Sequence, residues 1–180
     1  MTRENMMKKE YIILFFIIMI LAISPLILLE YQKSRYTPTE ELKRFGVYSI
    51  EKKTIENKDV IIAYQIKNKI ENRLPGDIDP GSKVEICYIT WYLFNNFEDR
   101  DEVQIISYYN NSGKLAIYYK FKIDRRDAEV AGILDVPKSE IFPNVYYYYR
   151  KIIKLGTLKV KDVNIPYWRR VNNGNNNTYQ

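Results

Sequence analysis

The stretch VQIISYYNNSGKLAIYYKFKI, residues 103–123, carries the clearest fold signal in the sequence. Two runs with apolar residues at alternate positions, Val103–Tyr109 and Lys114–Ile123, flank the sequence Asn-Asn-Ser-Gly at 110–113. A period of two is typical of strands with one packed face and one solvated face, and Asn, Ser and Gly favour tight turns. The stretch therefore predicts an antiparallel β-hairpin.

Runs of the same kind lie on both sides of this hairpin. We expect strands over 60–70, 84–94 and 157–165, with two Pro-Gly turn pairs at 75–76 and 80–81 between the first two. In the first of these strands, alternation separates the side chains of Ile62, Tyr64 and Ile66 from those of Ala63, Gln65 and Lys67. Strands with this pattern are half buried.

Two further segments allow more than one interpretation. Residues 128–136 fit a strand or a turn of helix. In 144–156, helical spacing places on one face the residues Val145, Tyr148, Tyr149, Ile152 and Ile153. Asn144 and Gly156 suit the ends of a helix, but four successive tyrosines favour a strand. We predict a strand for 144–156.

Six to eight short strands with turns every 8 to 12 residues predict a mainly β fold, an antiparallel β-sandwich. Residues 72–86 resemble the Pro-Gly-then-strand rhythm of immunoglobulin-like repeats on prokaryotic surface proteins. We assign the sandwich to residues 47–171 and a disordered Asn-rich tail to 172–180. Residues 30–46 are expected to form a stalk with a short helix over 39–45, ended by Gly46.

The N-terminal part of the chain indicates a membrane anchor. Tyr11–Leu29 contains 19 residues without a charge, enough for a helix of about 28 Å, close to the hydrocarbon thickness of a bilayer. Lys8 and Lys9 precede this run, so residues 1–10 are predicted to be cytoplasmic and the C-terminal domain to lie outside the cytoplasm. The run exceeds the usual length of a signal-peptide core, which favours an uncleaved signal-anchor helix over a cleaved signal peptide.

Composition restricts the chemistry that the chain can perform. It has 28 basic and 22 acidic residues, no His and one Cys, with a formal net charge of +6. His-dependent triads, His-ligated metal centres, Cys-rich zinc sites and internal disulfides are therefore excluded. Cys87 is expected to be a small buried hydrophobe, because no His is available to activate it. We predict no catalysis and no cofactor, with Ca²⁺ as an alternative.

Two groups of residues are candidate sites. Residues 137–180 hold 8 basic and 2 acidic side chains interleaved with aromatic ones. This combination suits an anionic partner, and the predicted binding residues are Tyr146, Tyr147, Arg150, Lys151, Trp168, Arg169 and Arg170. Two acidic loops offer oxygen ligands for Ca²⁺, namely Asp77 and Asp79 in the first and Asp99 and Asp101 in the second.

Together these patterns predict a single-pass, membrane-anchored surface or envelope protein of a prokaryote. Its exported domain would bind another envelope protein or an anionic surface polymer, and nucleic acid is not expected. One alternative is an anchored immunity or inhibitor protein that neutralises a toxin through the same basic region. The other is a carboxylate-dependent, carbohydrate-active enzyme that uses the acidic loops, since glycoside hydrolysis needs two carboxyl groups.

Overall fold

The computed structural model describes residues 15, 17–19, 35–71, 73–74, 76–111, 113–161, 170–173 and 176–179. The chain divides into two compact units, Met1–Tyr36 and Thr37–Gln180. In the first unit, Phe15 and Ile17–Met19 are helical and exposed, and β1 covers Arg35–Tyr36. The rest of the predicted anchor at 11–29 lies outside the described residues. Within the described part of the chain, no helix is both long and apolar enough to cross a membrane.

The second unit is built on a mixed sheet of five strands. In spatial order they are β2 (Val47–Ile55), β3 (Lys58–Lys67), β4 (Glu102–Asn111), β5 (Lys114–Asp124) and β6 (Thr157–Val160). Strands β2 and β3 form one antiparallel hairpin, and β4 and β5 form the second. Strand β3 pairs with β4 in parallel, and β6 pairs antiparallel with β5. The hairpin predicted from residues 103–123 is confirmed.

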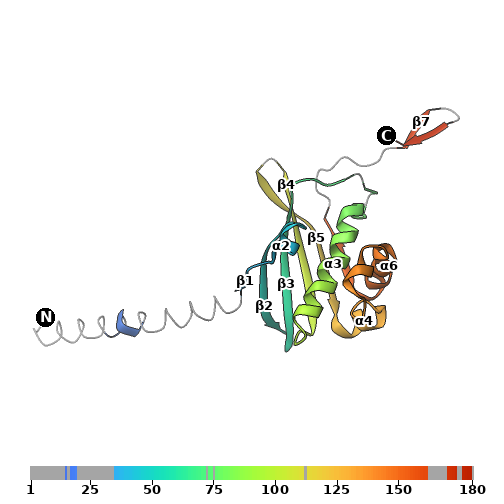
Figure 1. Ribbon diagram of the computed structural model, residues 1–180. Coiled ribbons are helices and arrows are strands. Elements are labelled where there is room, and N and C mark those ends of the chain that lie inside the picture. The colour runs from blue at the N-terminus through green and yellow to red at the C-terminus, as the bar shows by residue number, and fades with distance from the viewer. Residues whose placement is uncertain are drawn as a thin grey trace, which may run out of the picture. The chain divides into compact units, whose positions relative to one another are not determined.

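The helices of this unit gather on one side of the sheet (Figure 1). They are α2 (Glu40–Lys43), α3 (Pro80–Asn96), α4 (Arg125–Ala131), α5 (Lys138–Ile141) and α6 (Val145–Leu155). Helix α3 is the crossover that the parallel pair β3 and β4 requires. It contacts β4, helix α4 contacts β5, and α6 packs on both α3 and α4.

The prediction of a domain organised around a β-sheet is confirmed, but the β-sandwich is wrong because the layer against the sheet is helical. The decisive segment is 84–94, predicted as a strand and found inside α3. Asp79 caps this helix by accepting the Ser82 backbone N–H at 3.1 Å, and Pro80 occupies the first turn. Apolar residues occur all around α3, so burial between the sheet and α6 stabilises the helix despite its strand-favouring composition.

The segment with four successive tyrosines is helical, so the strand predicted for 144–156 is also wrong. In α6 the residues Val145, Tyr149 and Ile152 are buried, at the spacing expected for one side of a helix. Gly156 ends the helix, and its N–H donates to the carbonyl of Ile152 at 2.8 Å. Packing of this side against α3 and α4 outweighs the strand preference of tyrosine.

The domain begins earlier than predicted. Leu42 of α2 is fully buried in the core, so residues 37–46 are part of the domain rather than a free stalk. Gly46 follows this helix with a φ of +75°, as expected for a glycine that ends a helix. In the tail predicted to be disordered, β7 (Arg170–Asn173) and β8 (Asn176–Tyr179) pair antiparallel.

Candidate binding sites

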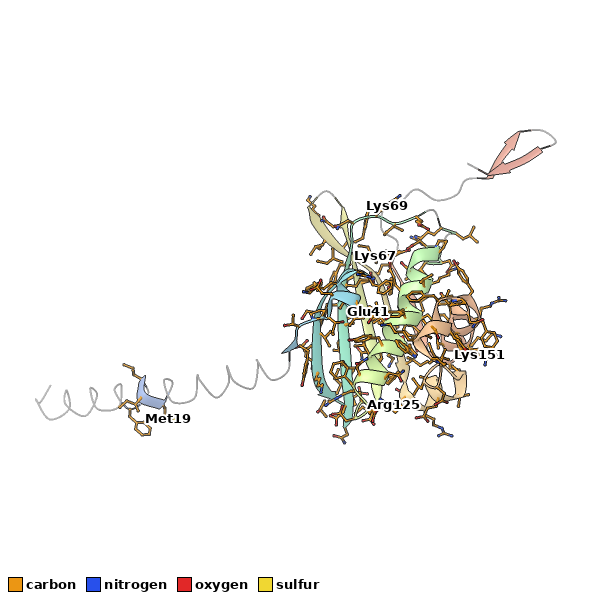
Figure 2. All side chains as sticks on the ribbon, viewed as in Figure 1. Met19, Glu41, Lys67, Lys69, Arg125 and Lys151 are labelled. Atoms are coloured by element: carbon orange, nitrogen blue, oxygen red, sulfur yellow. The ribbon has the colours of Figure 1, made fainter. Side chains whose placement is uncertain are left out.

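Helix α6 carries four of the predicted binding residues. Tyr146 and Tyr147 are 49% and 54% exposed. Arg150 is exposed and its Nε donates to the Tyr146 carbonyl at 3.3 Å, while the Lys151 ammonium lies 4.5 Å from the centre of the Tyr147 ring. Figure 2 shows Lys151 on the side of the helical layer away from the sheet. With Lys154 and no acidic residue, α6 presents an aromatic and basic surface.

The structure does not place the side chains of the other three predicted binding residues. Trp168 and Arg169 lie outside the described residues. Arg170 begins β7, and the structure describes its backbone only. We define the α6 surface as Tyr146, Tyr147, Arg150, Lys151 and Lys154.

The four predicted calcium ligands fall into two separate pairs. Asp77 and Asp79 precede α3, and Asp99 and Asp101 follow it. A helix of 17 residues is about 26 Å long, so the two pairs do not meet at one site. Within the described residues, no group of three or more acidic or thiol side chains is placed to hold a metal ion.

Each of these aspartates has a partner in the protein. Asp77 pairs with Lys83 at 2.6 Å, and Asp99 pairs with Arg100 at 2.5 Å. Asp101 accepts the backbone N–H of Asp59 at 2.8 Å. Asp79 differs from the other three because it is buried and belongs to a polar cluster that the sequence did not reveal.

That cluster lies where β3 ends and α3 begins. Lys67, the last residue of β3, donates to both carboxylate oxygens of Glu85 at 2.8 and 2.7 Å. Its ammonium is also 3.6 Å from Asp79 Oδ1. The Lys67 side chain is only 7% exposed, and Figure 2 shows it between the strands and α3. One buried cation therefore faces two carboxylates.

Amide and phenol groups complete the hydrogen bonding around Glu85. The Gln65 side chain donates from Nε2 to Glu85 Oε2 and to the carbonyl of Phe45, each at 2.6 Å. The Tyr119 hydroxyl donates to Gln65 Oε1 at 2.8 Å. These contacts tie the turn after α2, strands β3 and β5, and helix α3 to one another.

Asp79 is almost completely enclosed. Its Oδ2 accepts from the Ser82 hydroxyl at 2.5 Å and from the Tyr118 hydroxyl at 2.9 Å. Tyr118 and Tyr119 are both buried, although alternation places neighbours on opposite faces. A register shift opposite Ser107 leaves Tyr118 without a partner residue on β4, and this bulge turns its side chain inward.

Burial changes the protonation behaviour of the cluster. It raises the pKa of Glu85 above the usual carboxyl range, even though Lys67 and Gln65 favour the charged form. Burial also raises the pKa of Tyr119 well above that of a free phenol, and that of Tyr118 likewise. Both phenols therefore stay protonated near neutral pH and remain hydrogen-bond donors.

A hollow of about 410 Å³ opens onto this cluster. Its walls come from the turn after α2, the end of β3 and the first turns of α3. The charged residues that line it are Lys43, Arg44, Lys67, Lys69, Glu71, Asp79 and Glu85. Four of these are basic and three acidic, with Lys67, Asp79 and Glu85 at the buried end and the others more exposed.

The comparison with known proteins identifies an archaeal relative. The chain is 46% identical over 121 residues to the uncharacterized protein MJ0415 of Methanocaldococcus jannaschii. The match covers 67% of this chain and 74% of that protein. The chain belongs to the family of that archaeal protein. No family model and no solved structure matches the chain.

The buried cluster was not predicted from the sequence, because the alternation in β3 separated two faces without showing that the face with Gln65 and Lys67 is buried. Ile62, Tyr64 and Ile66 form the more apolar face, but Gln65 and Lys67 on the other face contact Glu85 of α3, and Ala63 belongs to the core. Gln65 and Lys67 are polar, so the alternation of apolar residues in the sequence does not mark them as buried. The sequence did contain one usable sign, the order Asp79-Pro80 that starts a helix, which would have moved Glu85 from a strand to α3.

Proposed function

We propose that the protein is a single-pass, membrane-anchored binding protein that captures an acidic partner through the α6 surface, without catalysing a reaction. The anchor is the uncharged run Tyr11–Leu29, with Lys8 and Lys9 on the cytoplasmic side and the domain outside. Phe15 and Ile17–Met19, within this run, are helical and expose apolar side chains, which supports a helix that meets lipid.

The observation that carries the proposal is the composition of the outer side of α6. Two tyrosines are about half exposed on a rigid helix beside three basic side chains, without a single acidic residue. Tyr and Arg dominate binding energy in protein interfaces, and clustered positive charge speeds association with an acidic partner. Half-exposed aromatic side chains beside positive charge are typical of protein interfaces, so we take an acidic envelope protein as the partner.

The two alternative functions differ in how much support they have. An anchored immunity or inhibitor protein would use the same α6 surface, and the identity of the partner separates it from an envelope-assembly role. A carbohydrate-active enzyme built from the two acidic loops is disfavoured, because these loops flank a helix about 26 Å long. Glycoside hydrolysis needs carboxyl groups within about 10 Å of each other.

The binding test reverses charge on two surfaces by the same amount. Full-length protein in detergent is loaded on immobilised poly-L-glutamate and eluted with salt. Arg150→Glu with Lys154→Glu should elute at clearly lower salt than the wild type. The matched control, Lys120→Glu with Lys159→Glu, changes two exposed lysines on strands β5 and β6 by the same net charge. Equal shifts for both pairs would contradict a special role for α6.

The topology is tested separately. A reporter enzyme that is active only outside the cytoplasm, fused after Gln180, should be active. An inactive reporter, with a cytoplasmic reporter active at the same position, would refute the exported domain. Replacing Ile17 and Ile18 by Lys should release the fusion from the membrane fraction, because two charges cannot be accommodated at the centre of a spanning helix.

A further inference from the structure

The hollow at the junction of β3 and α3 has the properties of a small-molecule site. Its volume of about 410 Å³ falls within the range of pockets that hold metabolites. It lies beyond the carboxyl end of β3, where that strand gives way to the crossover toward its parallel partner β4, a common location for ligands in sheets with helical crossovers. It is separate from the α6 surface, because no residue of α6 lines it.

The buried end of the hollow carries an excess of negative charge. Lys67 is the one cation there, and it faces the carboxylates of both Glu85 and Asp79. Asp79 has a 2% exposed side chain and accepts hydrogen bonds on both oxygens. Glu85 is 17% exposed and accepts three hydrogen bonds, from Lys67 on each oxygen and from Gln65 on Oε2.

A carboxylate offers about four lone-pair positions, so Oε1 of Glu85 retains one free acceptor position that can face the hollow. Gly81 keeps this end open. A Cβ atom at Gly81 would lie 3.2 Å from Asp79 Oδ1 and 4.0 Å from the Lys67 ammonium. The buried end therefore offers a position for one further hydrogen-bond donor with a positive charge.

The outer end of the hollow has the opposite character. Three basic residues and one acidic residue line it, namely Lys43, Arg44, Lys69 and Glu71, and all four are exposed. Arg44 follows α2, and Lys69 follows β3. Within the part of the chain that the structure describes, neither is held in an ion pair, whereas Lys43 is paired with Glu40 at 2.7 Å. A guanidinium and an ammonium that line the same opening are suited to an anionic group such as a carboxylate.

We propose that this hollow binds a small zwitterion of the amino-acid class, with its ammonium group on Glu85 and its carboxylate between Arg44 and Lys69. A simple anion would meet the excess negative charge of the buried end. A simple cation would meet the basic opening, and the described residues hold no set of three metal ligands. A ligand with both charges satisfies both ends of the hollow.

The test uses full-length protein in detergent and matched sets of ligands. The twenty standard amino acids are screened by thermal unfolding, and hits are titrated by calorimetry. Each hit is compared with its N-acetyl derivative, which lacks the ammonium, and with its amide, which lacks the carboxylate. We expect at least one amino acid to bind and both derivatives to bind at least ten-fold more weakly.

Variants locate the site. Arg44→Gln with Lys69→Gln should weaken binding of the amino acid at least ten-fold, and Glu85→Gln should do the same. The control, Lys120→Gln with Lys159→Gln, removes two positive charges elsewhere and should leave affinity unchanged. Both residues of the first pair are exposed, so their variant should keep the unliganded melting temperature, which separates lost binding from lost folding.

Three results would overturn the proposal. The first is that no amino acid raises the melting temperature. The second is that an N-acetyl derivative or an amide binds as tightly as its parent, which would show a simple anion or cation site. The third is that the control pair weakens binding as much as the pair at the opening. None of these results bears on the α6 surface, so the two proposals fail independently.

Discussion

Replacing Lys67 with Met tests whether the buried cluster is held together by charge. Methionine keeps most of the length of the side chain and removes the ammonium. In the wild type this group lies 2.8 and 2.7 Å from the two oxygens of Glu85 and 3.6 Å from Asp79. Because the Lys67 side chain is only 7% exposed, its ammonium is held mainly by these carboxylates and little by bulk water. The variant leaves two carboxylates facing each other without a cation.

The expected loss in the free energy of unfolding follows from the burial of the two carboxylates that remain. Removing one partner of a buried ion pair typically destabilises a protein by about 3 to 5 kcal/mol. Glu85 retains 17% exposure and its hydrogen bond from Gln65, so we expect the lower end, about 3 kcal/mol at pH 7. For a domain of this size the melting temperature should fall by roughly 10 °C.

The loss should depend on pH in a defined direction. Burial already raises the pKa of Glu85 in the folded protein, and removal of Lys67 raises it further. A carboxyl group whose pKa is raised by folding favours the folded state below its unfolded pKa, and this stability is lost as the pH rises through the folded value. The destabilisation caused by Lys67→Met should therefore be smaller at pH 5 than at pH 7.

The full-length protein in detergent is unfolded with urea at both pH values, and unfolding is monitored by circular dichroism. Lys120→Met, which changes an exposed lysine on β5, is the control and should change stability by less than about 0.5 kcal/mol. Adding Glu85→Gln to Lys67→Met should restore at least about 1 kcal/mol, because the pair is then removed as a whole. A loss below about 1 kcal/mol for Lys67→Met, or no recovery in the double variant, would refute the charge-coupled cluster.

Two further predictions concern a pair of glycines and the buried cysteine. Gly46 and Gly76 share a φ of +75°, but a Cβ atom would meet the Ile66 carbonyl oxygen at 2.4 Å from Gly46 and nothing within 4 Å from Gly76. Gly76→Ala should therefore cost about 1 kcal/mol in urea unfolding and Gly46→Ala about 2 kcal/mol more, and equal losses would contradict the close approach. Cys87 is fully buried, and burial raises its pKa to about 12, so iodoacetamide at pH 8 should modify it only in denaturant, as seen by mass spectrometry. Rapid modification of the folded protein would show that the thiol is accessible.

The elements that were predicted correctly depend on local sequence. The hairpin at 103–123 follows from a period of two and a turn sequence, both contained within about twenty residues. The short helix before Gly46 follows from its flanking residues in the same way. Only four residues of the predicted anchor at 11–29 are described, so that assignment remains a prediction.

The elements that were predicted wrongly depend on what packs against them. Residues 84–94 have the composition of a strand, but they lie between the sheet and α6 and are buried on most sides as part of α3. For 144–156 the helical spacing of Val145, Tyr149 and Ile152 was visible, yet the preference of tyrosine for strands was given more weight. In both segments, burial of the helix against its neighbours contributes more to stability than the small intrinsic preference of these residues for a strand.

The two candidate sites differ in the same way, because one is formed by neighbours in the sequence and the other by residues far apart in it. The basic and aromatic composition of α6 was readable from the sequence, because neighbours along the chain remain neighbours on a helix. The contacts of Lys67 with Glu85, and of Asp79 with Tyr118, join residues 18 and 39 positions apart. By itself, the sequence determined local periodicity, the uncharged N-terminal run and the absence of histidine chemistry. Only the tertiary structure decided which face of β3 is buried, because that choice depends on where α3 packs.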